Sequence, residues 1–299
     1  MNNIPKSPLP LLLGLAIALS FPAAHAADWS FNADASITQG TYKNSLQRDK
    51  LSERGLRITG DYLDRGGITL GYGTTWVGMK NGVTATDQNN VLLSGRMNFT
   101  PDAIPGRLTA RLDAHRINNN DATRNTDDVS VLAAQLGWLA KSENLYADIG
   151  YADSSYQNQL SVRQYTPTVG FGLNGGSDWI QLRSYLVRGL NPARASGKSS
   201  TTGLDTKWTH YFAAQSAWVP KSLTLGVASG ERIYGVDMDA QLVANLADLN
   251  KGAATLGLGW DINRNFKIFA LAGQSRYRNV ALANDYKLNV GYLGLNLNW

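Results

Sequence analysis

Apolar and polar residues alternate along most of this chain, and the alternation is clearest in its last nine residues. Leu293, Leu295, Leu297 and Trp299 occupy every second position. A β-strand with this period has one apolar face and one polar or small face. The amphipathic ring of tryptophan is best accommodated where a membrane meets water. The pattern therefore predicts a strand that lies with one face against lipid.

Similar segments recur in pairs along the sequence. Apolar residues alternate from 56 to 62, a tight turn follows at 64–67, and the alternation resumes from 68 to 76. Short turns are predicted near residues 65, 103, 142, 176, 217 and 263, and polar loops over residues 42–54, 81–90, 118–128, 154–159 and 189–203. This arrangement predicts an all-β, transmembrane, antiparallel up-and-down β-barrel. We expect about fourteen strands, with twelve or sixteen as alternatives, because such barrels contain an even number.

The competing architecture is a soluble β-sandwich or solenoid, and the positions of the aromatic residues argue against it. A sandwich core favours aromatic side chains in the middle of its strands, whereas a membrane barrel carries them in girdles at the two interfaces. Here they collect at the ends of the apolar faces, at Trp29, Tyr72, Trp76, Phe99, Trp138, Phe212, Trp260 and Trp299. The distribution favours the barrel.

The first 26 residues have the features of a cleaved secretory signal. Lys6 precedes an apolar run at residues 11–19, and Ala24-His25-Ala26 is a small-x-small cleavage pattern. The apolar run is shorter than the roughly 20 residues that a spanning helix needs. We therefore expect a signal peptide at residues 1–26, a single barrel domain at residues 27–299, and export to the outer membrane. The chain contains no cysteine, which excludes both disulfides and a lipoprotein anchor.

The signal, the repeated hairpins and the Trp-ended last strand together resemble the Gram-negative outer-membrane β-barrels over the whole mature chain. This resemblance implies that Leu293, Leu295, Leu297 and Trp299 form an insertion signal read by the barrel assembly machinery. It also implies outer-membrane lipid and lipopolysaccharide as surroundings. A second resemblance, to YaiO-type barrels, rests on Trp179-Ile-Gln-Leu182, Ser184, Arg188-Gly189, Tyr151 and Ser161-Val-Arg163. It implies an outer-membrane location and assigns no functional residue.

If the apolar residues of each strand face lipid, the alternate residues face the lumen, and many of these are charged. Charges that are costly on the lipid face are tolerated in a water-containing barrel. The candidates for lining or selectivity are Arg57, Asp61, Arg96, Arg111, Asp113, His115, Arg183, Lys207 and Lys287. Either the cations give the lumen a positive potential that favours anionic or zwitterionic solutes, or they pair with aspartates and fill a narrow barrel.

The insertion at residues 230–252 differs from the other predicted loops. Leu242, Leu246 and Leu249 follow Asp237 and Asp239 at helical spacing. One hypothesis is that this insertion folds into the pore mouth, where the two aspartates form an acidic constriction. The alternatives are a site for a partner or divalent cation, or a strand extension or small helix above the membrane.

The mature chain offers little for catalysis. His115 lies two residues from Asp113 on the predicted inner face, where a salt bridge is the simpler interpretation than a catalytic dyad, and His210 is expected in the belt near the periplasmic end. No spacing of potential ligands suggests a metal, and we expect no cofactor. The net charge of +5 is scattered without a basic stripe, so nucleic acid is not an expected partner.

The sequence thus predicts a porin-like channel or accessory pore for small polar or anionic solutes, and not an enzyme. The first alternative is a closed structural or assembly barrel whose extracellular loops bind surface polysaccharide, lipopolysaccharide or a protein partner. The second is an outer-membrane enzyme that acts on lipid.

Overall fold

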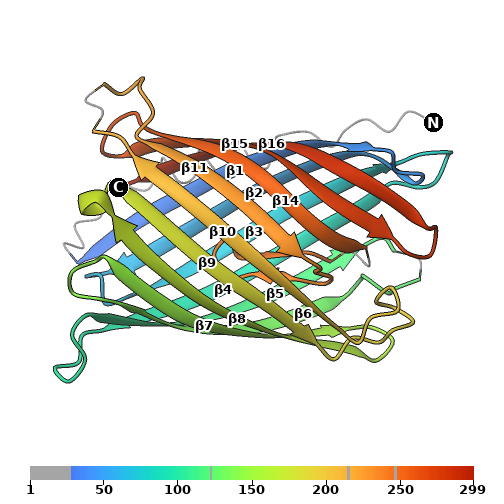
Figure 1. The fold of residues 1–299 in the computed structure, drawn as a ribbon, viewed down its shortest axis with the longest axis horizontal. Coiled ribbons are helices and arrows are strands. Elements are labelled where there is room, and N and C mark those ends of the chain that lie inside the picture. The colour runs from blue at the N-terminus through green and yellow to red at the C-terminus, as the bar shows by residue number, and fades with distance from the viewer. Residues whose placement is uncertain (1–27, 122, 214–215, 246–247) are drawn as a thin grey trace.

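Fourteen antiparallel strands form a closed barrel (Figure 1) in the computed structural model, which describes residues 28–299 except 122, 214–215 and 246–247. The predicted fold and strand number are confirmed. The predicted signal peptide, residues 1–26, lies outside the described residues. The barrel strands are β1 (Trp29–Lys43), β2 (Arg48–Tyr62), β3 (Gly66–Met79), β4 (Thr86–Phe99), β5 (Arg107–Asn119), β6 (Val129–Leu139), β7 (Leu145–Tyr156), β8 (Leu160–Leu173), β9 (Asp178–Arg188), β10 (Ser200–Tyr211), β11 (Ser222–Gly230), β14 (Leu249–Asp261), β15 (Phe266–Asn279) and β16 (Asn284–Asn298).

The barrel closes where the first strand meets the last. β1 pairs with β16 in one unbroken register from Asn32 opposite Asn298 to Lys43 opposite Lys287. Beyond that ladder, the amide of Phe31 donates to the carbonyl of Trp299 at 2.9 Å, and the amide of Trp299 donates to the carbonyl of Phe31 at 3.0 Å. Closure leaves no sheet edge with unpaired backbone groups, which is what a lipid environment requires of strands.

Each strand has two chemically distinct faces, as the alternation predicts. In β5, Leu112 is 53% exposed on the outer face, whereas its neighbour Asp113 is 1% exposed on the inner face. Outer leucines of other strands, such as Leu70 and Leu93, are exposed in the same way. Because adjacent side chains of a strand point to opposite faces, apolar residues form a band on the outer wall and polar residues such as Asp113 face the interior. Nearer the loop end, inward residues of β5 to β9 are apolar as well.

The predicted short turns all lie at one end of the barrel, here called the turn end, together with the start of β1 and the end of β16. The other end, the loop end, carries the two longest connections, residues 189–199 and 231–248. Two of the predicted loops are much too long, because β1 and β2 leave only residues 44–47 between them, and β3 and β4 leave only 80–85. The strands continue toward the loop end beyond the apolar band. Their outer side chains are polar there, so a run of polar residues does not indicate where a strand ends.

An interruption in the wall lies next to a predicted lumen residue. β8 and β9 pair at Tyr165 opposite Leu186 and again, in the same register, at Thr168 opposite Arg183. Pro167, which lies between these pairs, has no backbone N–H to donate. The ladder is therefore open for two residue pairs beside Arg183.

A short segment between β11 and β14, residues 231–248, belongs to no barrel strand and is called the inner segment below. It contains a two-stranded hairpin of β12 (Val236–Asp237) and β13 (Leu242–Val243). The helix suggested by the leucine spacing is not formed, since Leu242 lies in β13 and Leu249 begins β14, while Leu246 lies outside the described residues. Among the residues that the structure describes, no helix is long and apolar enough to cross a membrane.

Candidate pore constriction

The inner segment lies inside the barrel. Arg57 of β2 donates to the carbonyl of Ala240 at 3.0 Å, Arg111 of β5 donates to the carbonyl of Met238, and Gln164 of β8 donates to the carbonyl of Val236 at 2.6 Å. These strands occupy different sides of the closed sheet. A single hairpin reaches all three only by crossing the lumen, so this part of the chain narrows the interior.

Apolar packing holds the inner segment against one side of the wall. Ile233, Tyr234, Val236 and Met238 are buried in one cluster with inward residues of β5 to β9. The wall contributes Ile117, Val129, Val131, Ala133, Ala152, Tyr156, Leu160, Val162 and Val187 to this cluster. Burial of apolar surface is the main favourable term in such packing, so the segment is anchored as part of the fold.

Backbone pairing adds to this anchoring. The amide group of Gln164 both donates to the carbonyl of Val236 and accepts from its N–H, at 2.6 and 2.9 Å. This side chain therefore pairs with the backbone of β12 as a neighbouring strand would. It satisfies two backbone groups that would otherwise be buried without partners.

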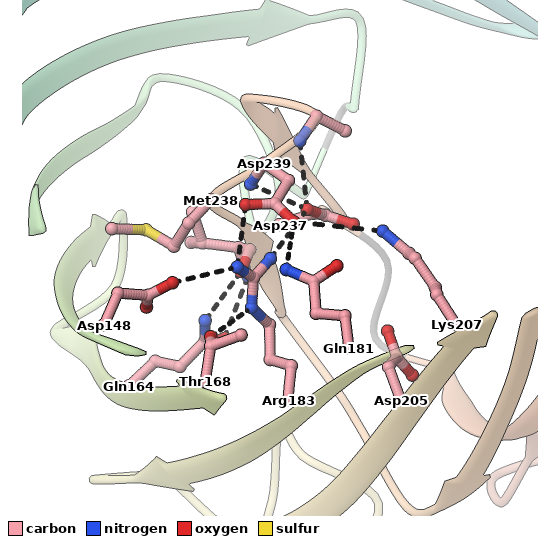
Figure 2. A network of polar contacts seen from close by, with 12 residues as sticks. Asp148, Gln164, Thr168, Gln181, Arg183, Asp205, Lys207, Asp237, Met238 and Asp239 are labelled. Atoms are coloured by element: carbon pink, nitrogen blue, oxygen red, sulfur yellow. Dashed lines mark hydrogen bonds and ion pairs between the residues drawn. The ribbon is translucent and has the colours of Figure 1, made fainter. Parts of the chain in front are cut away.

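Arg183 of β9 is the centre of the polar contacts between the wall and the inner segment (Figure 2). Its guanidinium donates to Asp239 at 2.7 Å and to Thr168 at 2.8 Å. It also lies 3.5 Å from Asp148 and 3.8 Å from Asp237. Because the Arg183 side chain is only 3% exposed, this charge depends on the carboxylates around it.

The charge of Asp239 is stabilised by the same contacts. Burial alone would raise its pKa, but the hydrogen bond and charge of Arg183, with Lys207 and Gln181 nearby, outweigh burial and lower the pKa of Asp239. Gln181 donates to Asp239 at 3.2 Å, and the Lys207 ammonium lies 3.9 Å away. The carboxylate is therefore ionised at neutral pH.

Both ends of the inner segment are fixed as well. At its start, Arg232 pairs with Asp205 at 3.0 Å and lies over the ring of Tyr185. At its end, Asp248 accepts hydrogen bonds from Tyr286 at 2.6 Å and from Arg48. The loop-end part of the lumen is thus crossed by a segment that is bound at its start, middle and end.

The predicted lumen residues fall into three groups. Arg57, Arg111, Arg183 and Lys207 all meet the inner segment, and Asp113 joins them, accepting from Gln241 at 3.2 Å and pairing with Arg111 at 3.1 Å. Asp237 and Asp239 lie on the segment itself, facing Arg183. Asp61 and Arg96 form a separate pair at 2.6 Å nearer the turn end.

Two further predictions have different outcomes. His115 is buried on the inner face, but neither ring nitrogen has a hydrogen-bond partner among the described residues, so it forms no hydrogen-bonded dyad with Asp113. Lys287 is wrong as a lumen residue. β16 pairs without a bulge, so Lys287 shares a face with Leu293, Leu295 and Leu297, and it is exposed on the outer wall.

His210 lies near the turn end, as expected for a belt residue. Its Nδ1 lies 2.9 Å from Asp178, which also accepts from the indole N–H of Trp208 at 2.9 Å. Among the described residues, no group of three or more histidine or carboxylate side chains is arranged to hold a metal ion.

Several residues of the constriction were not predicted from the sequence. Gln164, Asp148, Arg48 and Tyr286 all take part in holding the inner segment or Arg183. The only signal in the sequence is that these polar residues interrupt, or continue beyond, the series of inward positions in their strands. Nothing local shows which distant segment they bind.

At the turn end there is an open pocket of about 530 Å³. Its lining is mixed, with Asp34, Asp61, Arg96, Asn296 and Asn298 beside the rings of Phe31 and Trp299. The Asp61–Arg96 pair therefore lies in a water-accessible pocket, apart from the charged crossing.

No protein-family model and no curated protein matches the sequence. Solved structures are similar in fold. CymD, a monoaromatic hydrocarbon channel, superposes with a TM-score of 0.57 at 8% identity, over 91% of this chain and 88% of CymD. A deltaS2S3 mutant of the monoaromatic hydrocarbon channel TodX gives 0.54 at 10% identity, over 95% and 94%. The chain has the fold of an outer-membrane β-barrel.

At such low identity the similarity concerns the fold alone. The outer-membrane protein Omp33 of Acinetobacter baumannii also superposes, with a TM-score of 0.47 at 9% identity, over 91% of this chain and 99% of Omp33. The more specific resemblance to YaiO-type barrels stays a prediction.

Proposed function

We propose that the protein is an outer-membrane channel for small polar or anionic solutes, exported by the signal at residues 1–26 and narrowed by the inner segment. The observation that supports this most is the crossing itself, where Asp237 and Asp239 contact the wall cations Arg183 and Lys207 inside the barrel. Solutes that pass beside the segment would meet charges of both signs within a few ångströms. Such a site favours molecules that can form hydrogen bonds and ion pairs.

The chemistry of the lumen supports polar solutes over hydrocarbons. CymD and TodX are hydrocarbon channels, but only their fold is shared with this chain. Here the contacts between wall and inner segment involve Arg57, Arg111, Arg183 and Lys207, and the carboxylates Asp113, Asp148, Asp237 and Asp239, of which Lys207, Asp237 and Asp239 are the more exposed. The two signs are balanced, so zwitterions fit the crossing at least as well as simple anions.

Single-channel recording tests this proposal. Refolded protein in planar bilayers should show a stable, small conductance. A variant in which residues 234–245 are replaced by a short Gly-Ser linker should conduct several times more, because the obstruction is gone. Heat-dependent mobility on gels checks that the variant is still a folded barrel. Equal conductance of the two proteins would contradict the assignment of the inner segment as the constriction.

Ion selectivity tests the role of the wall cations. Replacement of Arg96 and Arg111 together by Gln should lower the ratio of anion to cation permeability, measured from reversal potentials in a salt gradient. Lys287→Gln is the matched control, since this lysine lies on the outer wall and should leave the ratio unchanged. An unchanged ratio in the double variant would remove these two arginines from the selectivity mechanism.

The second candidate function is a closed barrel, which the fixing of the inner segment at its start, middle and end favours. A closed barrel would be silent over a wide range of voltage, and the linker variant alone would conduct. The two functions therefore give different records from the same pair of proteins.

A further inference from the structure

The outer wall carries a group of cations at the loop ends of four neighbouring strands, called the outer basic patch below. The strands follow one another around the barrel in the order β2, β1, β16 and β15. The members of the patch are Lys50 and Arg54 of β2, Lys43 of β1, Lys287 of β16 and Arg276 of β15. Lys43, Lys50, Arg276 and Lys287 are exposed.

Three of these cations stand directly beside one another. Lys43 is opposite Lys287 in the β1–β16 ladder, and Lys287 is opposite Arg276 in the β15–β16 ladder. Directly opposed residues on one face have their Cβ atoms about 5 Å apart, and like charges in such positions are destabilising. An anion bound between them would remove that repulsion.

The protein itself does not supply this anion. Among the described residues, no carboxylate lies within ion-pairing distance of Lys43, Lys50, Arg54, Arg276 or Lys287. The nearby Asp285 is engaged elsewhere, at 3.6 Å from Arg278 and 3.9 Å from Lys251.

Two outer-wall arginines in another part of the barrel are paired. Arg116 of β5 pairs with Asp128, and Arg163 of β8 lies 3.7 Å from Asp153. The charges of these two arginines are therefore neutralised, whereas the cations of the patch have no carboxylate partner among the described residues; Arg188, opposite Arg163, is a further unpaired cation there. Arg116 and Arg163 are natural controls.

The position of the patch indicates the source of the anion. On the same four strands, the outer residues nearer the turn end are apolar, such as Leu56, Ile37, Leu293 and Ala272. These residues face the hydrocarbon. The patch begins beside them, at Arg54 opposite Ile37, and continues toward the loop end. In barrels of this type the loops are extracellular, so the patch lies at the level of the outer-leaflet headgroups and just beyond.

We propose that the outer basic patch binds the phosphate groups of a phosphorylated outer-leaflet lipid, such as lipid A of lipopolysaccharide. The clustered ammonium and guanidinium groups would contact the phosphates, while the acyl chains lie along the apolar wall below. The bound lipid would be a fixed part of the barrel surface at β15, β16, β1 and β2. This site is independent of the lumen and of the proposed channel.

Lipid titration of the purified, refolded protein tests the site. Affinities are measured for bis-phosphorylated lipid A, for its dephosphorylated form and for inorganic phosphate. The test variant is K43Q/R276Q/K287Q, and the control is R116Q/R163Q, which removes outer cations that are already paired. We expect at least tenfold weaker binding of phosphorylated lipid A by the test variant, and no change in the control.

Dephosphorylated lipid A should bind the wild-type protein no better than it binds the test variant. Wild-type affinity in the test variant would overturn the proposal, and so would equal loss in the control, which would indicate a general effect of charge. Displacement of the lipid by millimolar inorganic phosphate would also overturn it, because the site would then recognise the free ion. Unchanged channel conductance and heat-dependent mobility in the test variant show that the barrel is intact, so failure here leaves the proposed function untouched.

Discussion

At the scale of single residues, Arg183 shows how a charge in the lumen is used. Its guanidinium is buried and contacts Asp239 and Thr168, with Asp148 close by. A buried cation of this kind is held in place by its partners and contributes little free potential to a pore. Lys207, whose side chain is 42% exposed beside Asp239, is the more available cation for a passing solute. Arg183 thus anchors the inner segment, and Lys207 is the neighbouring cation that is available for selectivity.

The contact between Asp239 and Arg183 predicts a pH dependence. The pKa of Asp239 is lowered in the folded protein, so its ionised form stabilises the bound inner segment. That contribution is complete above the pKa of a free aspartate, about 4, and is lost as the pH falls further through the lowered value. We expect hydrogen exchange of the amides at 236–243 to have constant protection from pH 8 to pH 5, after correction for intrinsic rates, and to lose protection only below roughly pH 4.

Asp239→Asn is the control for this prediction. It should exchange faster at neutral pH and show a smaller change on acidification, because the ionisable partner of Arg183 is gone. An Asn variant with the full acid response of the wild type would assign the effect to another carboxylate, such as Asp237.

The same residues show what a sequence can predict. Parity along a strand identifies Arg57, Arg111, Asp113 and Arg183 as inward residues, since each alternates with an apolar outer neighbour. The prediction that Lys287 faces the lumen is wrong. Lys287 lies an even number of residues from Leu293 in an uninterrupted strand, so both side chains point outward. The partners of these residues could not be predicted, because contacts such as that of Arg183 with Asp239 join residues 56 positions apart that meet only in the folded barrel.

At the scale of elements, the inner segment is a connection that packs its apolar side chains against the inner face of the wall. Val236, Met238, Ala240 and Leu242 alternate with polar residues, but the leucine spacing from 242 to 249 also suggested a helix or a loop above the membrane. The structure has a hairpin in which Val236 and Met238 are buried while Leu242 is exposed. The local alternation is compatible with this hairpin, whereas its place inside the barrel depends on packing against distant strands.

This packing predicts the effect of truncating a core side chain. Met238 is 1% exposed within the cluster, so Met238→Ala should weaken attachment of the inner segment by roughly 2 kcal/mol or more. We expect faster hydrogen exchange in the segment and added open-state fluctuations in single-channel records. Leu242→Ala is the matched control, because this leucine is 47% exposed on the same hairpin and should have little effect. Similar exchange in both variants would show that polar contacts alone hold the segment.

At the scale of the whole molecule, every strand depends on closure of the ring. The sequence predicted the number of strands and the short turns, because turn residues and alternation are local signals. It did not predict how far the strands extend beyond the membrane at 42–54 and 81–90, since both faces can be polar there. The wall therefore extends beyond the apolar band at the loop end. The outer basic patch lies on the outer face of this extension, and the inner segment lies inside the barrel.

Closure also gives Trp299 a structural role in addition to its predicted part in the insertion signal. The residue exchanges two backbone hydrogen bonds with Phe31, and the two rings stack with centroids 6.1 Å apart. Deletion of Trp299 removes these contacts at the β1–β16 seam, so the folded fraction should fall even in lipid vesicles without assembly machinery, measured by heat-dependent mobility. Trp299→Phe keeps the backbone bonds and an aromatic ring and should fold nearly as well as wild type. If both variants fold normally in vesicles but the deletion fails in cells, the residue acts as a recognition signal and the seam does not need it. If the deletion fails in vesicles as well, closure itself depends on this last pair of hydrogen bonds, because an unpaired backbone at the seam is costly in lipid.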